Sequence, residues 1–319
     1  MTVPTPVSGT QHVLRAGDHV AHVASIGASL RALRRGDRDL IAPFGADELR
    51  PSMRGALLAP WPNRTANGEY EFGGRTHRLP LTEPELMNAA HGLVAWLDFV
   101  AVAKSADALT LRATIEPQPG YPWRVRVDTI FRLSADGLDQ EVVALNEADT
   151  AAPFGMGGHP YLVAGPARPR AIDAWSLQIP ATEMVLVDPE RLLPVGSVDV
   201  RDGDARFDFR TSRTIGDTTL NHAFTGLVRD PDGAARVRVL DADGDGAEVV
   251  WDERCPWVQI YTADGPGTGS HRHAVAVEPT TCPPDALNSK RDLATVEPGA
   301  TVSAAWSIRA VDGQRMPRA

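Results

Sequence analysis

Lysine and cysteine are the two residue types that this 319-residue sequence almost lacks. Lys104 and Lys290 are the only lysines among 32 basic residues, and Lys290 lies in a polar run that predicts a surface loop. Because imine-forming enzymes need a desolvated lysine, this scarcity disfavours aldolase chemistry through a Schiff base. Cys255 and Cys282 are too few for a disulfide framework and suit a reducing compartment, although one bridge between them stays open.

An excess of positive charge and long apolar runs are also missing. The formal net charge is −9 and the pI about 5.5, which gives no electrostatic footprint for nucleic acid or an anionic membrane. No window approaches the roughly 18 apolar residues of a membrane span, and the N-terminus lacks the basic and apolar segments of a signal peptide. We therefore expect a cytoplasmic protein with neither nucleic acid nor membrane as partner, and the oligomeric state is not indicated.

Helical periodicity is the third absence. No long stretch repeats its apolar residues every 3.6 positions, and 26 Pro and 28 Gly are scattered along the chain. Short alternating runs of strand length recur instead between turn residues. With no linker and no internal repeat, we expect an all-β protein with few short helices: one large antiparallel β-sandwich over residues 11–319, after a flexible tail over residues 1–10. The expected strands are 19–26, 30–33, 69–72, 99–103, 109–115, 123–133, 140–145, 176–179, 236–240, 248–251, 257–262, 274–278 and 301–309.

Three motifs partly match the sequence patterns of known ligand-binding sites. Residues 241–246 with Asp252 nearly match a calcium-binding EF-hand loop, but the runs on either side alternate like paired strands, which predicts a solvated hairpin turn. His271 and His273 share one face of an extended run, yet no third metal ligand follows at regular spacing. Residues 265–269 are rich in glycine but lack the lysine of a phosphate-binding loop. We therefore expect no metal site.

The stretch VEPTTCPPDALN at residues 277–288 holds the most informative carboxylate. Its preceding run reads as a strand, so Glu278 falls on the same face as Ala274 and Ala276. Two small residues leave open space in front of the acid, as a group aimed at a ligand requires. Pro279 should then end the strand, because proline has no N–H to donate. The alternative is a solvated glutamate at the end of an edge strand.

Two histidines are displayed beside glycines. His159 lies in GMGGHPY at residues 155–161, where glycines permit close backbone approach and the following proline keeps the residue extended. His91 precedes Gly92 in NAAHG. Either imidazole is a ligand-facing group or an ordinary structural histidine.

Two further side chains suit a polar ligand. Arg64 follows PWPN and precedes the Asn-Gly signal of a hairpin turn, so it is either a fixed guanidinium for ligand oxygens or a surface charge. Gln259 shares a strand face with Trp257 and Tyr261, a mixture that suits the ring face and hydroxyls of a sugar, although a half-buried sheet explains it equally. No Gly-x-Ser-x-Gly elbow is present, and neither cysteine has an obvious histidine partner, so the set suits proton transfer.

Together these segments resemble the aldose 1-epimerase (galactose mutarotase) family over roughly residues 25–310. Six motifs in family order carry the resemblance: PWPNRTANGEYEFGG (60–74), NAAHG (88–92), GGHPYL (157–162), LNHAF (220–224), WVQIYT (257–262) and VEPTTCPPDALN (277–288). The resemblance implies a large antiparallel β-supersandwich that interconverts α and β anomers of free sugars with no metal and no organic cofactor. By motif, Glu278 would be the general base, His159 the general acid and His91 a support for the site, while Arg64 and Gln259 would bind sugar hydroxyls.

The implied chemistry explains why these groups suffice. A proton leaves the anomeric hydroxyl O1 while another reaches the ring oxygen O5, the ring opens, and C1 turns before closure on its other face. We expect Glu278 and His159 on opposite sides of C1. Unperturbed pKa values near 4.3 for Glu and 6.5 for His make the glutamate the base and the histidine the donor at neutral pH.

Asn221 departs from the family pattern, which has aspartate before the histidine of LNHAF. An amide can still bond a sugar hydroxyl, so we expect Asn221 in substrate binding but not in catalysis. This departure keeps open a non-catalytic sugar-binding or sensor protein. A further alternative is an epimerase for a phosphorylated or sulfonated hexose, which would need an extra arginine facing C6. The preferred sugar is not indicated.

Overall fold

The largest sheet has nine antiparallel strands. The computed structural model describes residues 5–202, 205–265 and 271–313. Side chains alternate between the core and solvent along β12 (Val125–Ser134) and its neighbour β13 (Gly137–Asn146). In β12, for example, Val127 and Phe131 are buried while Arg132 is exposed. The order of strands is β10 (Val100–Lys104), β11 (Ala108–Ile115), β12 (Val125–Ser134), β13 (Gly137–Asn146), β27 (Thr301–Val311), β23 (Gly246–Trp251), β22 (Ala235–Leu240), β17 (Ser176–Gln178) and β20 (Arg213–Thr214).

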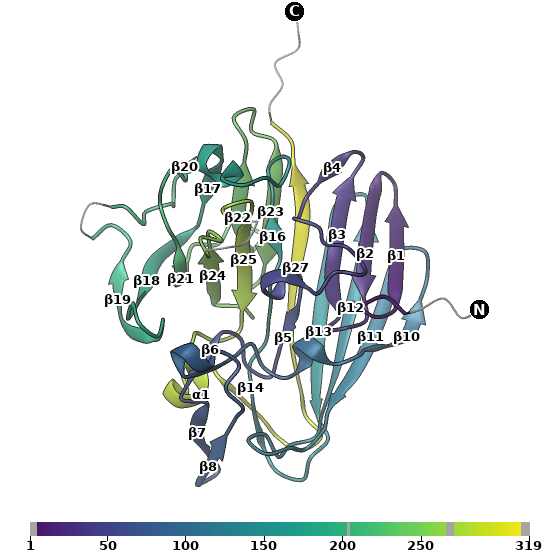
Figure 1. Cartoon of the computed structure of the whole chain (residues 1–319), viewed down its shortest axis with the longest axis vertical. Coiled ribbons are helices and arrows are strands. Elements are labelled where there is room, and N and C mark those ends of the chain that lie inside the picture. Colours follow the sequence, from purple (N-terminus) through teal and green to yellow (C-terminus); the bar gives the residue numbers. More distant parts are fainter. Residues whose placement is uncertain (1–4, 203–204, 266–270, 314–319) are drawn as a thin grey trace, which may run out of the picture.

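A four-stranded antiparallel sheet covers one half of this large sheet (Figure 1). Leu14 and Val23 from the small sheet join Leu111 and Phe131 from the large one in a common hydrophobic cluster. The two layers therefore form a sandwich, as the alternating pattern predicts. The small sheet contains β1 (Gln11–Ala16), β2 (His19–Ala24), β3 (Ser29–Arg35) and β4 (Arg38–Asp39).

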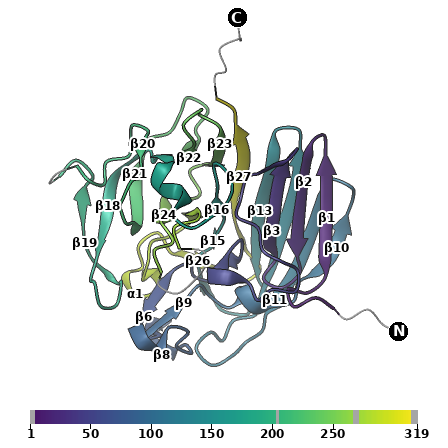
Figure 2. The same ribbon diagram turned by 45° about the horizontal axis from the view of Figure 1, so that its top comes forward.

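An eight-stranded antiparallel sheet lies against the other half of the large sheet (Figures 1 and 2). Val258 and Val277 belong to the same cluster as Val237 and Val249 of the large sheet, so one hydrophobic core runs through both sandwiches. The order is β19 (Pro194–Asp199), β18 (Ala181–Val187), β21 (Asn221–Leu227), β24 (Trp257–Tyr261), β25 (Val275–Thr280), β15 (Gly157–Gly158) and β5 (Leu57–Leu58), with β16 (Tyr161–Leu162) also paired to β25.

The remaining regular elements are short. Three two-stranded ladders and five short helices make up this remainder among the described residues. The ladders are β14 (Ala152–Phe154) with β26 (Ala294–Val296), β6 (Arg64–Ala66) with β9 (Asn88–Ala90), and β7 (Glu69–Phe72) with β8 (Arg75–Arg78). The helices are the 3₁₀ turns Pro51–Met53, Pro84–Leu86, Val94–Trp96 and Ala171–Ala174 and the single turn α1 (Ala286–Ser289).

The all-β antiparallel architecture predicted from the sequence is confirmed. Residues 241–245 form the turn between β22 and β23, as expected in place of an EF-hand. The tail expected over residues 1–10 is packed from Ser8 onward, because the Ser8 hydroxyl is buried and bonds to the carbonyl of Ala46; residues 1–4 lie outside the described part. No helix in the described ranges has the length and hydrophobicity to cross a membrane.

Candidate active site

Glu278 lies inside a sheet rather than at an edge. Its strand β25 has β24 on one side, with Gln259 paired directly opposite Glu278, and β15 and β16 on the other. The strand continues past Pro279, where we expected it to end, because the next residue still pairs with both neighbouring strands. Glu278 is 2 % exposed. The solvated edge position is therefore excluded, and the carboxylate has a rigid mount.

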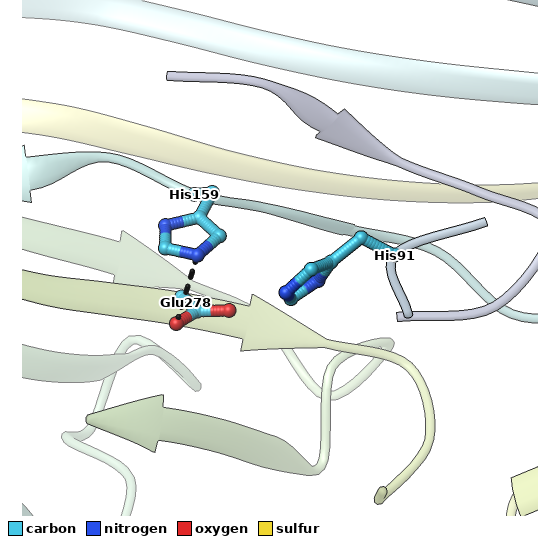
Figure 3. Close-up of side chains that lie close together, drawn as sticks. All are labelled: His91, His159 and Glu278. Atoms are coloured by element: carbon cyan, nitrogen blue, oxygen red, sulfur yellow. Dashed lines mark ion pairs between the residues drawn. The ribbon is translucent and has the colours of Figure 1, made fainter. Parts of the chain in front are cut away.

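His159 comes from the segment between β15 and β16. A Cβ on Gly158 would lie 2.5 Å from the indole of Trp306, so glycine is needed for the close backbone approach that the sequence predicted. Nε2 of His159 lies 3.4 Å from Oε1 of Glu278 (Figure 3). The two groups lie side by side. The expectation that they flank a sugar from opposite sides is wrong, because a gap of 3.4 Å admits no ring between them.

His91 reaches the same carboxylate from the end of β9. Its φ of +65° is unusual for a residue with a side chain, and Gly92 follows with φ of +74°. A Cβ on Gly92 would lie 2.0 Å from the carbonyl oxygen of Ala59, so this turn is held by backbone packing. The rings of His91 and His159 meet edge to face at 5.4 Å. Figure 3 shows both imidazoles converging on Glu278.

A cavity of about 630 Å³ lies in front of these side chains. This volume falls within the range of small-molecule sites, roughly 300–1,000 Å³. The structure brings together all six site residues predicted from the sequence: Arg64, His91, His159, Asn221, Gln259 and Glu278. The wall also contains residues that the sequence did not mark, because they lie in loops and turns of ordinary composition: Met53, Glu83, Glu85, Trp96 and Leu192.

Polar partners hold the wall in place. Nε and Nη2 of Arg64 donate to the two carboxylate oxygens of Glu83 at 2.8 and 3.0 Å, which orients the guanidinium and balances its charge. Nε2 of Gln259 donates to Oδ1 of Asn221 at 2.8 Å. Asn221 therefore offers its amide N–H groups to a ligand. Gln259 offers Oε1, which is buried and has no protein partner within the described part of the chain.

Burial reverses the order of the pKa values of Glu278 and His159 that the sequence led us to expect. Loss of solvent raises the pKa of the Glu278 carboxyl to about 8, and the charge of Arg64 offsets part of this rise. Loss of solvent lowers the pKa of His159 to about 3, with Arg50 and Arg54 acting in the same direction. Both charged forms are disfavoured because both side chains are almost fully buried. Between these values the pair holds one proton, which resides on the carboxyl in the free protein.

A stack of rings fixes the orientation of His159. The phenol ring of Tyr161 lies on the imidazole at 5.3 Å, and His273 lies on the opposite face of the phenol at 6.1 Å. The Tyr161 hydroxyl donates to the carbonyl oxygen of Ser52 at 3.3 Å. Arg54 lies over the same phenol ring and bonds Nε2 of His273 at 2.9 Å. His159 and Tyr161 lie two residues apart, but no sequence pattern indicated the stack, because Arg54 and His273 are distant from them along the chain.

The other motifs singled out in the sequence are described in part. Nη2 of Arg54 lies 2.9 Å from Nε2 of His273, so this nitrogen already has a protein partner. Residues 266–270 of the glycine-rich segment lie outside the described residues. Cys255 and Cys282 are both free and buried. The one group of three metal-ligating side chains within the described residues is His91, His159 and Glu278, whose ligand atoms all lie within 4.8 Å of one another.

Comparison with known proteins identifies relatives across almost the whole chain. Residues 10–309 match the family model described as aldose 1-epimerase. The uncharacterized protein YihR of Escherichia coli K12 is 32 % identical over 304 residues, covering 92 % of this chain and 90 % of YihR. The galactose mutarotase of Mus musculus is 27 % identical over 274 residues, covering 79 % of this chain and 76 % of the mouse protein.

Solved structures share the same fold. The GalM/aldose epimerase homologue of C. elegans superposes with a TM-score of 0.81 at 17 % identity, covering 96 % of this chain and all of that protein. A putative aldose 1-epimerase of Escherichia coli K12 gives 0.78 at 22 % identity, covering 94 % and 98 %. At 17 % and 22 % sequence identity, these similarities show a common fold.

Proposed function

Because the chain belongs to the aldose 1-epimerase family, we propose that it interconverts the α and β anomers of a free hexose or a related aldose. The observation that carries this proposal is the buried pair of Glu278 and His159, 3.4 Å apart beside a cavity of sugar size. Two proton-transfer groups meet the needs of this reaction, which we propose to run without metal or organic cofactor.

The side-by-side arrangement suits the atoms of the reaction. O1 and O5 are both bonded to C1, so they lie only two bonds apart and two adjacent groups can serve both oxygens. The Glu278 carboxylate accepts the proton of the O1 hydroxyl while the His159 imidazolium donates to O5, and the C1–O5 bond breaks. C1 then turns about the C1–C2 bond, and closure reverses both transfers. Each such group contributes about 10²–10⁴-fold in rate.

One proton is enough for this cycle. The carboxylate with imidazolium and the carboxyl with neutral imidazole contain the same proton count. Ring opening from the charged form leaves the proton on Glu278 and His159 neutral, and closure restores the charged form. Because burial favours the neutral form in the free protein, sugar hydrogen bonds and the charge of Arg64 must help to reach the charged one. Started from the neutral form, the same cycle exchanges the two roles.

The remaining polar groups would position the sugar. Arg64 uses Nε and Nη2 on Glu83, which leaves Nη1 for a hydroxyl. Asn221 supplies N–H donors and Gln259 supplies an acceptor. His91 contacts His159 edge to face and would support the same reacting centre.

Anomer exchange on freshly dissolved sugar tests the proposal. We expect Glu278→Gln and His159→Ala each to reduce the exchange rate, followed by polarimetry or NMR, to the level without protein while both variants stay folded. Retained exchange in both variants would refute the assignment. A panel of anomerically pure sugars, including neutral hexoses and hexoses with a phosphate or sulfonate at C6, would give the preferred substrate.

Two alternatives have separate outcomes in the same panel. A non-catalytic sugar-binding protein, suggested by Asn221, would be stabilised against heat by a sugar without accelerating exchange. A C6 anion would have to compete with Glu83 for Arg64, the only arginine among the described residues that line the cavity. The cytoplasmic location inferred from the sequence stays a prediction.

A further inference from the structure

We propose that His91, His159 and Glu278 also form a three-ligand site for a divalent transition-metal ion, with Zn²⁺ as the best match, and that the ion and the sugar exclude each other. The three side chains come from separate parts of the chain, the end of β9, the turn before β16 and the middle of β25 (Figure 3). Two imidazoles and one carboxylate with an open fourth position are a donor set of catalytic zinc sites.

The distances fit such an ion. Zinc bonds of about 2.0–2.2 Å place neighbouring tetrahedral ligand atoms about 3.4 Å apart. Nε2 of His159 and Oε1 of Glu278 already have this separation, at 3.4 Å. All ligand atoms of the three residues lie within 4.8 Å. Because tetrahedral ligand atoms lie about 3.4 Å apart, a pair at the 4.8 Å limit must close by roughly 1.4 Å on binding.

The ligand groups are available. Nδ1 of His91 and Oε2 of Glu278 are buried and have no protein hydrogen-bond partner among the described residues. Nε2 of His159 already faces Oε1 of Glu278 at 3.4 Å. The terminal torsion of a glutamate is broad, so the carboxylate can turn either oxygen toward an ion. His273 gives the contrast, since Arg54 already occupies its Nε2. The fourth position would open onto the cavity, where water or a hydroxyl can bind.

The surroundings set the affinity and the type of ion. Imidazole ligands favour Zn²⁺, Co²⁺, Ni²⁺ and Cu²⁺ over Mg²⁺ and Ca²⁺. High-affinity metal sites orient each histidine by a hydrogen bond from its second nitrogen to an acceptor. Among the described residues Nδ1 of His159 has no such acceptor. We therefore expect micromolar rather than nanomolar affinity, which makes the ion a reversible inhibitor and not a resident cofactor.

The metal ion and the sugar compete because both need the lone pairs of the same carboxylate and imidazole. A metal-bound carboxylate and imidazole can neither accept nor deliver a proton, so the metal-bound protein would not open a sugar ring. This second half of the inference rests on the proposed function. The binding half does not, because the ligand set is the same whatever the cavity holds.

Cobalt binding in the absence of sugar tests the site directly. The probe is Co²⁺ added to the full chain without any histidine tag, followed through the visible absorption of the metal. We expect the intense bands of four-coordinate Co²⁺, displaced by Zn²⁺, and their loss in His91→Ala. The matched control is His77→Ala, whose ring stacks on Tyr70 away from the cavity and whose variant should bind like the parent. Binding weaker than about 1 mM, or binding that survives His91→Ala, would overturn the site.

Anomer exchange then tests the competition. Zn²⁺ at ten times its dissociation constant should raise the apparent KM about elevenfold with kcat unchanged, and a chelator should reverse the effect. Inhibition that lowers kcat alone contradicts competition. The two proposals fail separately: cobalt binding without exchange activity removes the proposed function and leaves the metal site, whereas exchange activity without cobalt binding does the reverse.

Discussion

The phenol ring of Tyr161 lies parallel to the imidazole of His159, with 9° between the planes and 5.3 Å between the centroids. Only Pro160 separates the two residues in the chain, and His273 covers the other face of the phenol. Ring packing therefore orients the imidazole, whose carboxylate partner is Glu278. Its direction in the cavity depends on a side chain that need not touch the sugar.

Replacing this ring tests its positioning role. We expect Tyr161→Leu to lower kcat about tenfold or more with a smaller change in KM, because a misdirected imidazole transfers protons poorly. Tyr161→Phe keeps the ring and loses only the bond to Ser52, so it should retain most of the activity and the pH profile of the parent. Equal losses in the two variants, measured by saturation kinetics, would show that the hydroxyl and not the stack matters.

The pH dependence should be broad. Below about pH 3 both groups are protonated and no base remains, and above about pH 8 the pair has lost its shared proton and no acid remains. The enzyme-dependent kcat/KM should therefore stay level from pH 5 to 7 and fall above about pH 8. Exchange NMR across pH 4–9, with the spontaneous rate subtracted, measures this. A decline already complete by pH 7 would indicate unperturbed groups and contradict the effect of burial.

Glu278→Gln should become more stable relative to the parent as pH rises. The folded pKa of Glu278 is raised to about 8, so between about pH 4.3 and pH 8 the folded protein keeps a proton that the unfolded chain has lost. The protonated Glu278 carboxyl therefore contributes fully to stability below pH 4.3, and this contribution is lost as pH approaches 8. Glutamine mimics the protonated carboxyl at every pH. The melting temperature of the variant should exceed that of the parent by a few degrees at pH 8 and by less at pH 5.

A surface variant supplies the comparison. Glu71 is exposed on β7, and Glu71→Gln should leave the difference in melting temperature independent of pH. The lowered pKa of His159 acts in the opposite direction, since that contribution is lost as pH falls below about 6.5, so the change between pH 6.5 and pH 8 reports Glu278. A constant difference for Glu278→Gln would mean that the carboxyl titrates normally.

Arg64→Leu should act mainly on binding. The variant loses charged donors facing the cavity, each worth about 1.5–3 kcal/mol, so we expect KM to rise about 10–100-fold with kcat less affected. Glu83→Gln retains a partner for the guanidinium while removing the opposing charge, so its KM should stay within a few-fold of the parent. Saturation kinetics of anomer exchange with the preferred sugar measure both variants. A loss confined to kcat would place Arg64 at the reacting atoms instead.

Asn221→Asp should tighten sugar binding several-fold. A carboxylate accepts a charge-assisted hydrogen bond from a hydroxyl while still accepting from Gln259. Its negative charge would also raise the pKa of Glu278 further, moving the alkaline decline of kcat/KM upward. Unchanged KM and unchanged pH profile together would show that residue 221 does not face the substrate.

The sequence predicted those strands whose alternation is regular. β12 reads VRVDTIFRLS and β22 reads ARVRVL, and both were expected within a few residues of their bounds. β18 and β21 were missed, because ATEMVLV does not alternate strictly and NHAFTGL begins with polar residues and contains glycine. Two-residue strands such as β15 are too short to show a periodic pattern, and they are strands only because they pair with adjacent strands of the sheet.

The six residues predicted from the sequence all line the candidate cavity, but their arrangement was not predictable. Glycines around His159 and small residues before Glu278 marked both as displayed groups, and both line the cavity. Their 3.4 Å separation and the reversal of their pKa values depend on how deeply the sheets bury them, which no local pattern encodes. The stack on Tyr161 joins residues more than a hundred positions apart and was invisible for the same reason.

The turn at His91 and Gly92 affects how mutational scans of this protein would be interpreted. A methyl group on Gly92 would collide with the backbone of Ala59, so any larger residue there must displace the neighbouring imidazole. Such a variant would lose turnover while every proton-carrying side chain remained in the sequence. A screen that scores activity alone would count this glycine among the chemical groups, although its contribution is to hold another residue in position.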